Sequence, residues 1–249
     1  SIFSAVYAFG QKVGDRRAQV WPSVLKELRQ ALAILPLVRS DLSRPVSPVL
    51  VQTDACDTGC AAVYTTDVPH TELRREYQQP RTRPREEGRK WDVDKDLAAE
   101  FDAPLDPDAW RIAWRRDYKP GSIEACAHIN TKELGAAVDA VRWASRAPRT
   151  RRCRLVLQSD NGDTVCWLRK GRSSRPGPLR HCRRLAAMTL ADRISVEARH
   201  VRTDRNMADQ PSRSRTARPG PCVPAHASES EAGTPTAVIE LARLALGFA

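Results

Sequence analysis

Four acidic residues lie where the chain can bring carboxylates together. Asp54 and Asp160 each end a short apolar run, Glu133 lies in the first turn of a helical pattern, and Asp209 follows the last strand-like segment. Clustered carboxylates repel one another, and several cannot stay ionised side by side unless hard divalent cations compensate them. Two such ions about 4 Å apart activate water and stabilise the leaving oxygen of a phosphodiester. The four residues therefore predict metal-dependent phosphoryl transfer.

Each of these residues also has a simpler structural explanation. Asp54 and Asp160 both precede turn-forming residues, so each can be an ordinary turn residue. Glu133 and Asn130 are three residues apart and fit a capping-box-like pair in which Asn130 caps the helix. Asp209 can simply favour the start of a helix. Only the joint placement of the four acids at the ends of predicted elements favours a site.

The elements that must position these residues are strands that alternate with helices. Apolar runs predict strands at 49–51, 61–64, 110–114, 155–157 and 194–198, and the last alternates with polar residues as in a half-buried strand. Helical patterns cover 22–39, 130–147, 165–168 and the residues after Pro178. This order predicts a mixed sheet with helices on its faces. Asp54 and Asp160 would meet if their strands are parallel neighbours, because functional groups collect beyond the carboxyl ends of such strands.

Two segments differ in composition from this pattern. Residues 67–108 are rich in Arg, Glu, Asp and Pro with little periodicity, which predicts an extended, mobile, charged insertion. Residues 214–235 are rich in Pro, Ser and Arg, which predicts a disordered C-terminal tail, and 236–248 can form one more amphipathic helix.

Composition narrows the classes of protein. The formal net charge is +11, which fits nucleic-acid binding or simply a solvated basic surface. The seven cysteines form no CxxC pair, which argues against a zinc site or a disulfide framework and favours a reduced intracellular compartment, nucleus or cytoplasm. We find no signal peptide and no apolar run of roughly 18 residues, so we expect neither secretion nor a membrane span.

Four motifs occur in one order along the chain. They are TDACDTG at 53–59, INTKEL at 129–134, QSDN at 158–161 and NMADQPSR at 206–213. Together they resemble the ribonuclease H domains of reverse transcriptases, especially those of gypsy-like and DIRS-like retroelements. The resemblance covers about residues 46–213, and the insertion is unmatched.

The resemblance implies a ribonuclease H-like five-stranded mixed sheet flanked by helices. It also implies that Asp54, Glu133, Asp160 and Asp209 bind two Mg²⁺ ions, for which Mn²⁺ can substitute, and that His200 assists product release or proton transfer. The residues expected to contact nucleic acid are Asn161, Lys170, Arg172, Ser173, Asn206 and Arg213. The substrate would be an RNA–DNA hybrid, and the remainder of a reverse transcriptase polyprotein is the expected partner.

The resemblance also divides the chain. Residues 1–45 are similar to the helical segment that joins the polymerase to ribonuclease H, residues 46–213 form the catalytic domain, and 214–249 form the tail. The chain has no YxDD-type polymerase motif. Two features depart from the family. The spacing from Asp54 to Glu133, 133 − 54 = 79 residues, is longer than the family usually shows. Gly135 lies inside a predicted helix, where glycine costs about 1 kcal/mol relative to alanine.

Three functions remain to be distinguished. The first is hydrolysis of the RNA strand of RNA–DNA hybrids. The second is a degenerate or co-opted remnant that binds nucleic acid without cleaving it. The third is another nuclease of the same general fold, such as a transposase or integrase, although those proteins lack the ending at 206–213.

Overall fold

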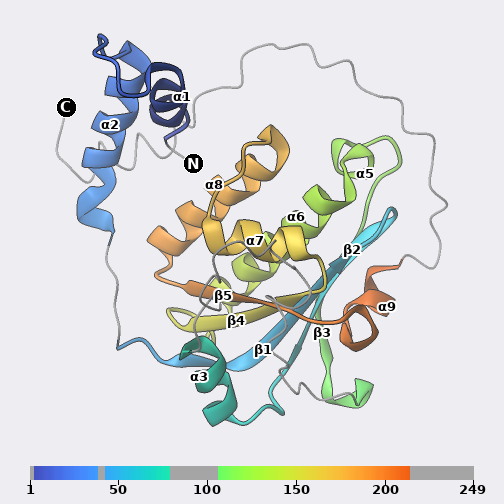
Figure 1. Ribbon diagram of the computed structural model, residues 1–249. Coiled ribbons are helices and arrows are strands. Elements are labelled where there is room, and N and C mark those ends of the chain that lie inside the picture. Colours follow the sequence, from blue (N-terminus) through green and yellow to red (C-terminus); the bar gives the residue numbers. More distant parts are fainter. Residues whose placement is uncertain (1–2, 39–42, 79–105, 214–249) are drawn as a thin grey trace, which may run out of the picture. The chain divides into compact units, whose positions relative to one another are not determined.

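The computed structural model describes residues 3–38, 43–78 and 106–213 (Figure 1). The chain divides into two compact units, with the boundary between Leu42 and Ser43. None of the helices in the described part of the chain is long and apolar enough to cross a bilayer.

The first unit contains two helices and a short 3₁₀ turn. Their bounds are α1 (Ser4–Val13), α2 (Pro22–Ile34) and η1 (Leu35–Leu37). Pro22 occupies the first position of α2, where its missing N–H group costs nothing, as the sequence predicts. The carboxylate of Glu27 accepts two backbone N–H groups at the start of α1, both at 2.9 Å, and so satisfies donors that the helix itself leaves unpaired.

The second unit is built on a five-stranded mixed sheet, with the strand order β3-β2-β1-β4-β5 (Figure 1). The strands are β1 (Val46–Ala55), β2 (Gly59–Thr65), β3 (Arg111–Asp117), β4 (Arg154–Ser159) and β5 (Ser195–His200). β2 pairs antiparallel with both β1 and β3, whereas β4 pairs parallel with both β1 and β5. The predicted five-stranded mixed sheet is confirmed.

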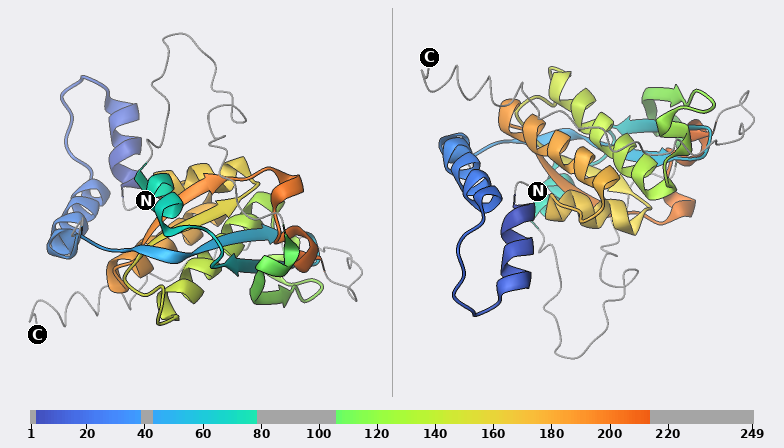
Figure 2. Two further views of the ribbon diagram at one scale, coloured as in Figure 1. Left: turned by 90° about the horizontal axis from the view of Figure 1, so that it is seen from below. Right: turned by 90° about the horizontal axis from the view of Figure 1, so that it is seen from above.

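Helices cover both faces of this sheet (Figures 1 and 2). One face carries α6 (Ile129–Arg146), α7 (Gly162–Lys170) and α8 (Pro176–Ala191), and the other carries α3 (His70–Gln78). Short helices lie in the connections: η2 (Pro107–Ala109), α5 (Ile123–Cys126), η3 (Thr203–Arg205) and α9 (Asp209–Ser212).

Neighbouring residues of β1 show how the two layers are filled. Val51 is buried in one core cluster with Leu134 of α6, whereas Leu50 is buried in another with Leu73 of α3. Because successive side chains of a strand point to opposite faces, β1 is apolar on both sides. The central strand that carries Asp54 is therefore packed on both faces.

The helix α3 corrects the prediction of an extended insertion over residues 67–108. Residues 70–78 are helical, and Leu73 is completely buried against the sheet. Leu73 and Tyr77 are four residues apart and so lie on one face of the helix. Because these two apolar residues stand among many charged ones, the sequence of this helix shows little hydrophobic periodicity. Residues 79–105 of the predicted insertion and the predicted tail, residues 214–249, lie outside the described residues.

We expect Leu73→Ala to lower the free energy of unfolding by about 2–4 kcal/mol, because it removes a fully buried side chain and leaves a cavity. Urea denaturation of the purified chain measures this. Arg74→Ala, at an exposed neighbouring position, is the control and should change stability by less than about 0.5 kcal/mol. Equal stability of the two variants would mean that α3 does not contribute to the core.

The glycine inside α6 lies where two helices approach closely. A Cβ atom at Gly135 would lie 3.2 Å from Cε1 of His181 on α8. Contacts this short are rare for real Cβ atoms, so an alanine here would require His181 to shift. The helix propensity lost at Gly135 is therefore offset by close packing of α6 against α8.

The strand β5 departs from the predicted half-buried pattern. Glu197 and Arg199 lie on the face that the alternation assigns to solvent, yet they are only 1% and 3% exposed. Their charged groups approach to 3.7 Å. The prediction of a solvated face is wrong, because paired opposite charges allow both side chains to be buried.

Candidate metal centre

Three of the four predicted acids meet at one edge of the sheet. β1 and β4 are parallel neighbours, with Thr53 opposite Ser159, so the next residues along each strand, Asp54 and Asp160, emerge side by side. The first turns of α6 add Glu133. One carboxylate oxygen from each of the three residues lies within 4.8 Å of the others. Asp54, Glu133 and Asp160, called the acidic triad below, form a cluster that can hold a metal ion.

Burial makes the acidic triad costly without a cation. Asp54 and Glu133 are each 5% exposed. Burial, followed by the charges of neighbouring carboxylates, raises the pKa of Glu133 to about 9. Burial also raises the pKa of Asp54 to about 6, and the hydrogen bond from Ser212 opposes this rise. Within the described residues, Oε2 of Glu133 is buried and accepts no hydrogen bond. A buried, unpartnered carboxylate oxygen among other carboxylates fits a hard divalent cation such as Mg²⁺.

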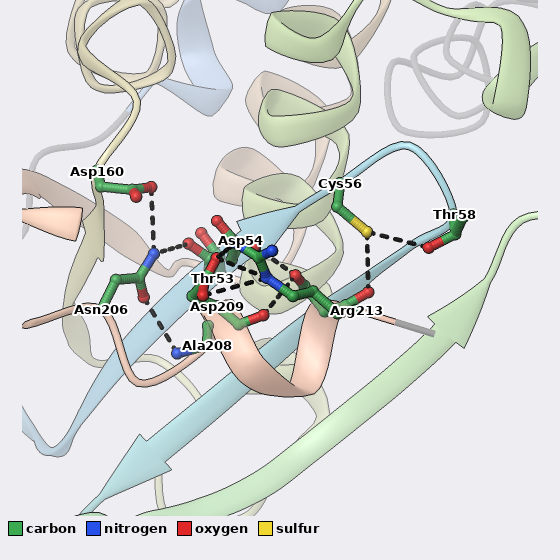
Figure 3. Close-up of polar contacts among 10 residues, drawn as sticks. Thr53, Asp54, Cys56, Thr58, Asp160, Asn206, Ala208, Asp209 and Arg213 are labelled. Carbon is green, nitrogen blue, oxygen red and sulfur yellow. Dashed lines mark hydrogen bonds and ion pairs between the residues drawn. The ribbon is translucent and has the colours of Figure 1, made fainter. Parts of the chain in front are cut away.

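The orientation of Asp54 is fixed by α9. The hydroxyl group of Ser212, itself 1% exposed, donates a hydrogen bond to Oδ2 of Asp54. The backbone oxygen of Ser212 in turn accepts a hydrogen bond from the Cys56 thiol at 3.2 Å (Figure 3). A Cβ atom at Gly59 would lie 3.0 Å from the same oxygen, so the glycine permits α9 to lie against the β1–β2 turn. These contacts connect the end of α9 to the strand that carries Asp54.

We expect Ser212→Ala to weaken Mn²⁺ binding by about tenfold, because residues that orient a metal ligand typically contribute this much to affinity. Calorimetric titration of the metal-free chain measures the change. Ser173→Ala, beyond the far end of α7, is the matched control and should bind the ion as the wild type does. Unchanged affinity in Ser212→Ala would show that this hydroxyl group does not orient Asp54 for a metal ion.

Asn206 holds the loop that follows β5 against the acidic triad. Its side-chain amide donates to Oδ1 of Asp160 at 3.1 Å and to the backbone oxygen of Thr53 at 3.2 Å (Figure 3). Its side-chain oxygen accepts the N–H group of Ala208 at 3.1 Å. Asn206 was predicted to contact nucleic acid. Its observed contacts lie within the protein, where it bridges the ends of β1 and β4, and its contact with nucleic acid stays a prediction.

Sequence reasoning missed Gln52, which anchors the same loop. Gln52 is completely buried, and its amide donates to Gln158 of β4 at 2.8 Å and to the backbone oxygen of Arg205 at 3.3 Å. Its oxygen accepts the N–H group of Met207 at 2.8 Å. A glutamine between valine and threonine in a buried strand was the available signal, because a buried amide needs partners.

Asp209 lies beside the acidic triad but is paired with a cation. It begins α9, and Nη2 of Arg213 lies 2.8 Å from its Oδ1 atom (Figure 3). Its charge acts on Asp54, whose pKa is raised mainly by burial and additionally by Asp160 and Asp209, while Arg213 lowers it. The structure thus brings three predicted ligands into one compact group and leaves the fourth beside it.

The predicted auxiliary residue His200 ends β5. Its Nε2 atom lies 3.0 Å from the backbone oxygen of Asp160, so the ring is adjacent to the acidic triad. Asn161 follows Asp160 directly and caps α7, where its side chain accepts the N–H group of Thr164 at 3.0 Å. Asn161 therefore has a structural role beside the triad, whether or not it also contacts nucleic acid.

The predicted cap of α6 requires a correction. The helix begins at Ile129, and the capping side chain is His128, which accepts the N–H group of Asn130 at 3.2 Å. The side chain of Asn130 instead contacts Asp163 and Asn161 at the start of α7. A histidine is an uncommon cap, and Asn130 matched the preferred residue type so well that the cap was placed two residues late.

The predicted phosphate-contacting segment lies at the other end of α7. Lys170 is the last residue of this nine-residue helix, which is about 13 Å long and begins two residues after Asp160. Gly171 adopts a left-handed conformation with φ of 62° that ends the helix, and Arg172 and Ser173 follow it. Lys170 and Arg172 are exposed. Any contact of this segment with nucleic acid would therefore be remote from the metal centre.

Neither a protein-family model nor a curated protein matches this sequence.

Proposed function

We propose that this chain is a metal-dependent endonuclease that hydrolyses the RNA strand of RNA–DNA hybrids, as the ribonuclease H domain of a retroelement reverse transcriptase. The observation that carries the proposal is the acidic triad. Parallel strands bring Asp54 and Asp160 together, and α6 adds Glu133 with a buried oxygen that lacks a partner. The order of the four sequence motifs supports the choice of substrate.

The reaction follows from general two-metal chemistry. When bound, divalent ions lower the pKa of a water molecule and stabilise the charge that develops on the leaving oxygen. The water oxygen forms a bond to phosphorus while the bond from phosphorus to the 3′ oxygen breaks, which leaves a 5′-phosphate and a 3′-hydroxyl. Asp54, Glu133 and Asp160 would hold the ions. The nearby ring of His200 supports a role in moving a proton or releasing the product.

The hybrid would be bound through its backbone and 2′-hydroxyl groups rather than through its base sequence. The net charge of +11 supports this, because arginine and lysine neutralise phosphates and release counterions. Binding should therefore weaken steeply as salt is added. Lys170 and Arg172 are candidates for contacts away from the cleavage site, as exposed cations at the C-terminal end of α7 and just after it.

The experiment is a cleavage assay of the purified chain on three labelled duplexes of one sequence: RNA–DNA hybrid, double-stranded DNA and double-stranded RNA. We expect cleavage of the RNA strand of the hybrid alone, with Mg²⁺ or Mn²⁺, and none with a chelator. Cleavage of double-stranded DNA would favour a transposase- or integrase-type nuclease. Binding of the hybrid without cleavage would favour the alternative, a degenerate or co-opted binding domain.

A further inference from the structure

The fourth acid, Asp209, is occupied by a cation that belongs to the chain. The guanidinium group of Arg213 faces the Asp209 carboxylate with three contacts, at 2.8, 3.2 and 3.3 Å. A planar guanidinium suits a carboxylate in this way, because its N–H groups form a rigid fork. Arg213 therefore lies where a positive charge is needed beside the acidic triad.

This pairing is open to exchange. The Arg213 side chain is 69% exposed and that of Asp209 is 36% exposed, so water screens their attraction. Exposed ion pairs are weak, because each partner is well solvated when apart. A divalent ion, with twice the charge of a guanidinium group, can displace Arg213 from Asp209 when substrate phosphate oxygens supply further ligands.

We propose that Arg213 competes with the second metal ion for Asp209, so that the free chain presents one strong ion site at the acidic triad and a weaker second site. This inference rests on the proposed function, because it takes the triad to be a metal centre. Release of Arg213 frees Asp209 to become a ligand. The chain thereby sets the metal concentration at which its second site fills.

A second arginine–aspartate pair, at η3 between β5 and α9, provides a matched control. Arg202 contacts Asp204 at 3.1 and 3.2 Å, and the two side chains are 70% and 63% exposed. Arg202 and Arg213 are thus alike in exposure and in the partner they hold, but Asp204 is not among the predicted metal ligands. Arg202→Gln removes the same charge as Arg213→Gln without freeing Asp209.

The experiment is a Mn²⁺ titration of the metal-free full chain, with free ion measured by electron paramagnetic resonance. In Arg213→Gln we expect the second ion to bind about threefold to fivefold more tightly and the first to change by less than about twofold. Arg202→Gln should bind as the wild type does, and Asp209→Asn should lose the second ion. The Mg²⁺ concentration for half-maximal hybrid cleavage should fall by a similar factor in Arg213→Gln alone.

Two outcomes would overturn the inference, and they differ. If Arg213→Gln and Arg202→Gln bind both ions equally, Arg213 is an ordinary surface residue and the proposed function is unaffected. If the wild type binds no ion, or if Asp54→Asn binds ions as the wild type does, the acidic triad is not a metal centre. The proposed function then fails together with the inference. Thermal unfolding of each variant in a chelator verifies that the substitutions leave the fold intact.

Discussion

Asp160→Asn should lower magnesium-dependent hybrid cleavage by roughly a hundredfold to a thousandfold. An amide keeps the shape of the side chain but removes the negative charge that a divalent ion requires at the ends of β1 and β4. Asp54→Asn should have an effect of the same size, because the carboxylates of Asp54 and Asp160 lie in one cluster within 4.8 Å. Rates measured with saturating hybrid and a range of Mg²⁺ concentrations would test both variants.

Asp163→Asn is the matched control for this loss of charge. Asp163 lies only three residues beyond Asp160, in the first turn of α7, but its side chain is exposed and contacts Asn130 rather than the acidic triad. Asparagine retains an oxygen for that contact. We expect Asp163→Asn to cleave within about threefold of the wild type. If Asp160→Asn cleaved as fast as Asp163→Asn, the acidic triad would not be the catalytic centre.

The parts of the site that the sequence predicts are those set by strand geometry. Asp54 and Asp160 each lie three residues after a run of buried apolar residues, and β1 and β4 are parallel neighbours. The carboxyl ends of such strands meet at one edge of the sheet, so the strand ends are predicted by local patterns, whereas the parallel pairing that joins them comes from the fold. Glu133 could be placed near the start of its helix, because a capping residue type followed by an apolar stripe predicts where a helix begins.

The parts that escaped prediction depend on contacts between distant segments. Ser212 contacts Asp54 across 158 positions, and Gln52 holds a loop 153 positions away. Neither residue type indicates its partner, since serine and glutamine are polar residues that usually lie in solvent. Arg213 was expected to contact nucleic acid, and only the folded chain shows that its guanidinium group pairs with Asp209. Local patterns thus predict where ligands emerge, but not which residues orient or neutralise them.

Glu133→Gln should stabilise the metal-free chain while it abolishes cleavage. The folded-state pKa of Glu133 is about 9 and its ordinary value is 4.5, so the folded chain holds this proton more tightly than the unfolded chain does. Stability from this group is therefore complete below pH 4.5 and is lost as the pH rises toward 9. At pH 7 the cost is about 3 kcal/mol, roughly 1.4 kcal/mol for each pH unit above the ordinary value. Glutamine avoids this cost because it does not ionise.

The measurement is the free energy of unfolding in urea, with a chelator present, between pH 5 and pH 8. The difference between Glu133→Gln and wild type should grow with pH, and contributions from other titrating groups largely cancel in it. Saturating Mn²⁺ should reverse the order of stability, because only the wild type keeps all three charges of the acidic triad to bind the ion. A glutamate whose only role was to stabilise the fold would not lower the free energy of unfolding at neutral pH. If Glu133→Gln were less stable than wild type without metal at every pH, the carboxyl group would have a structural role, and the electrostatic case for a metal centre would fail.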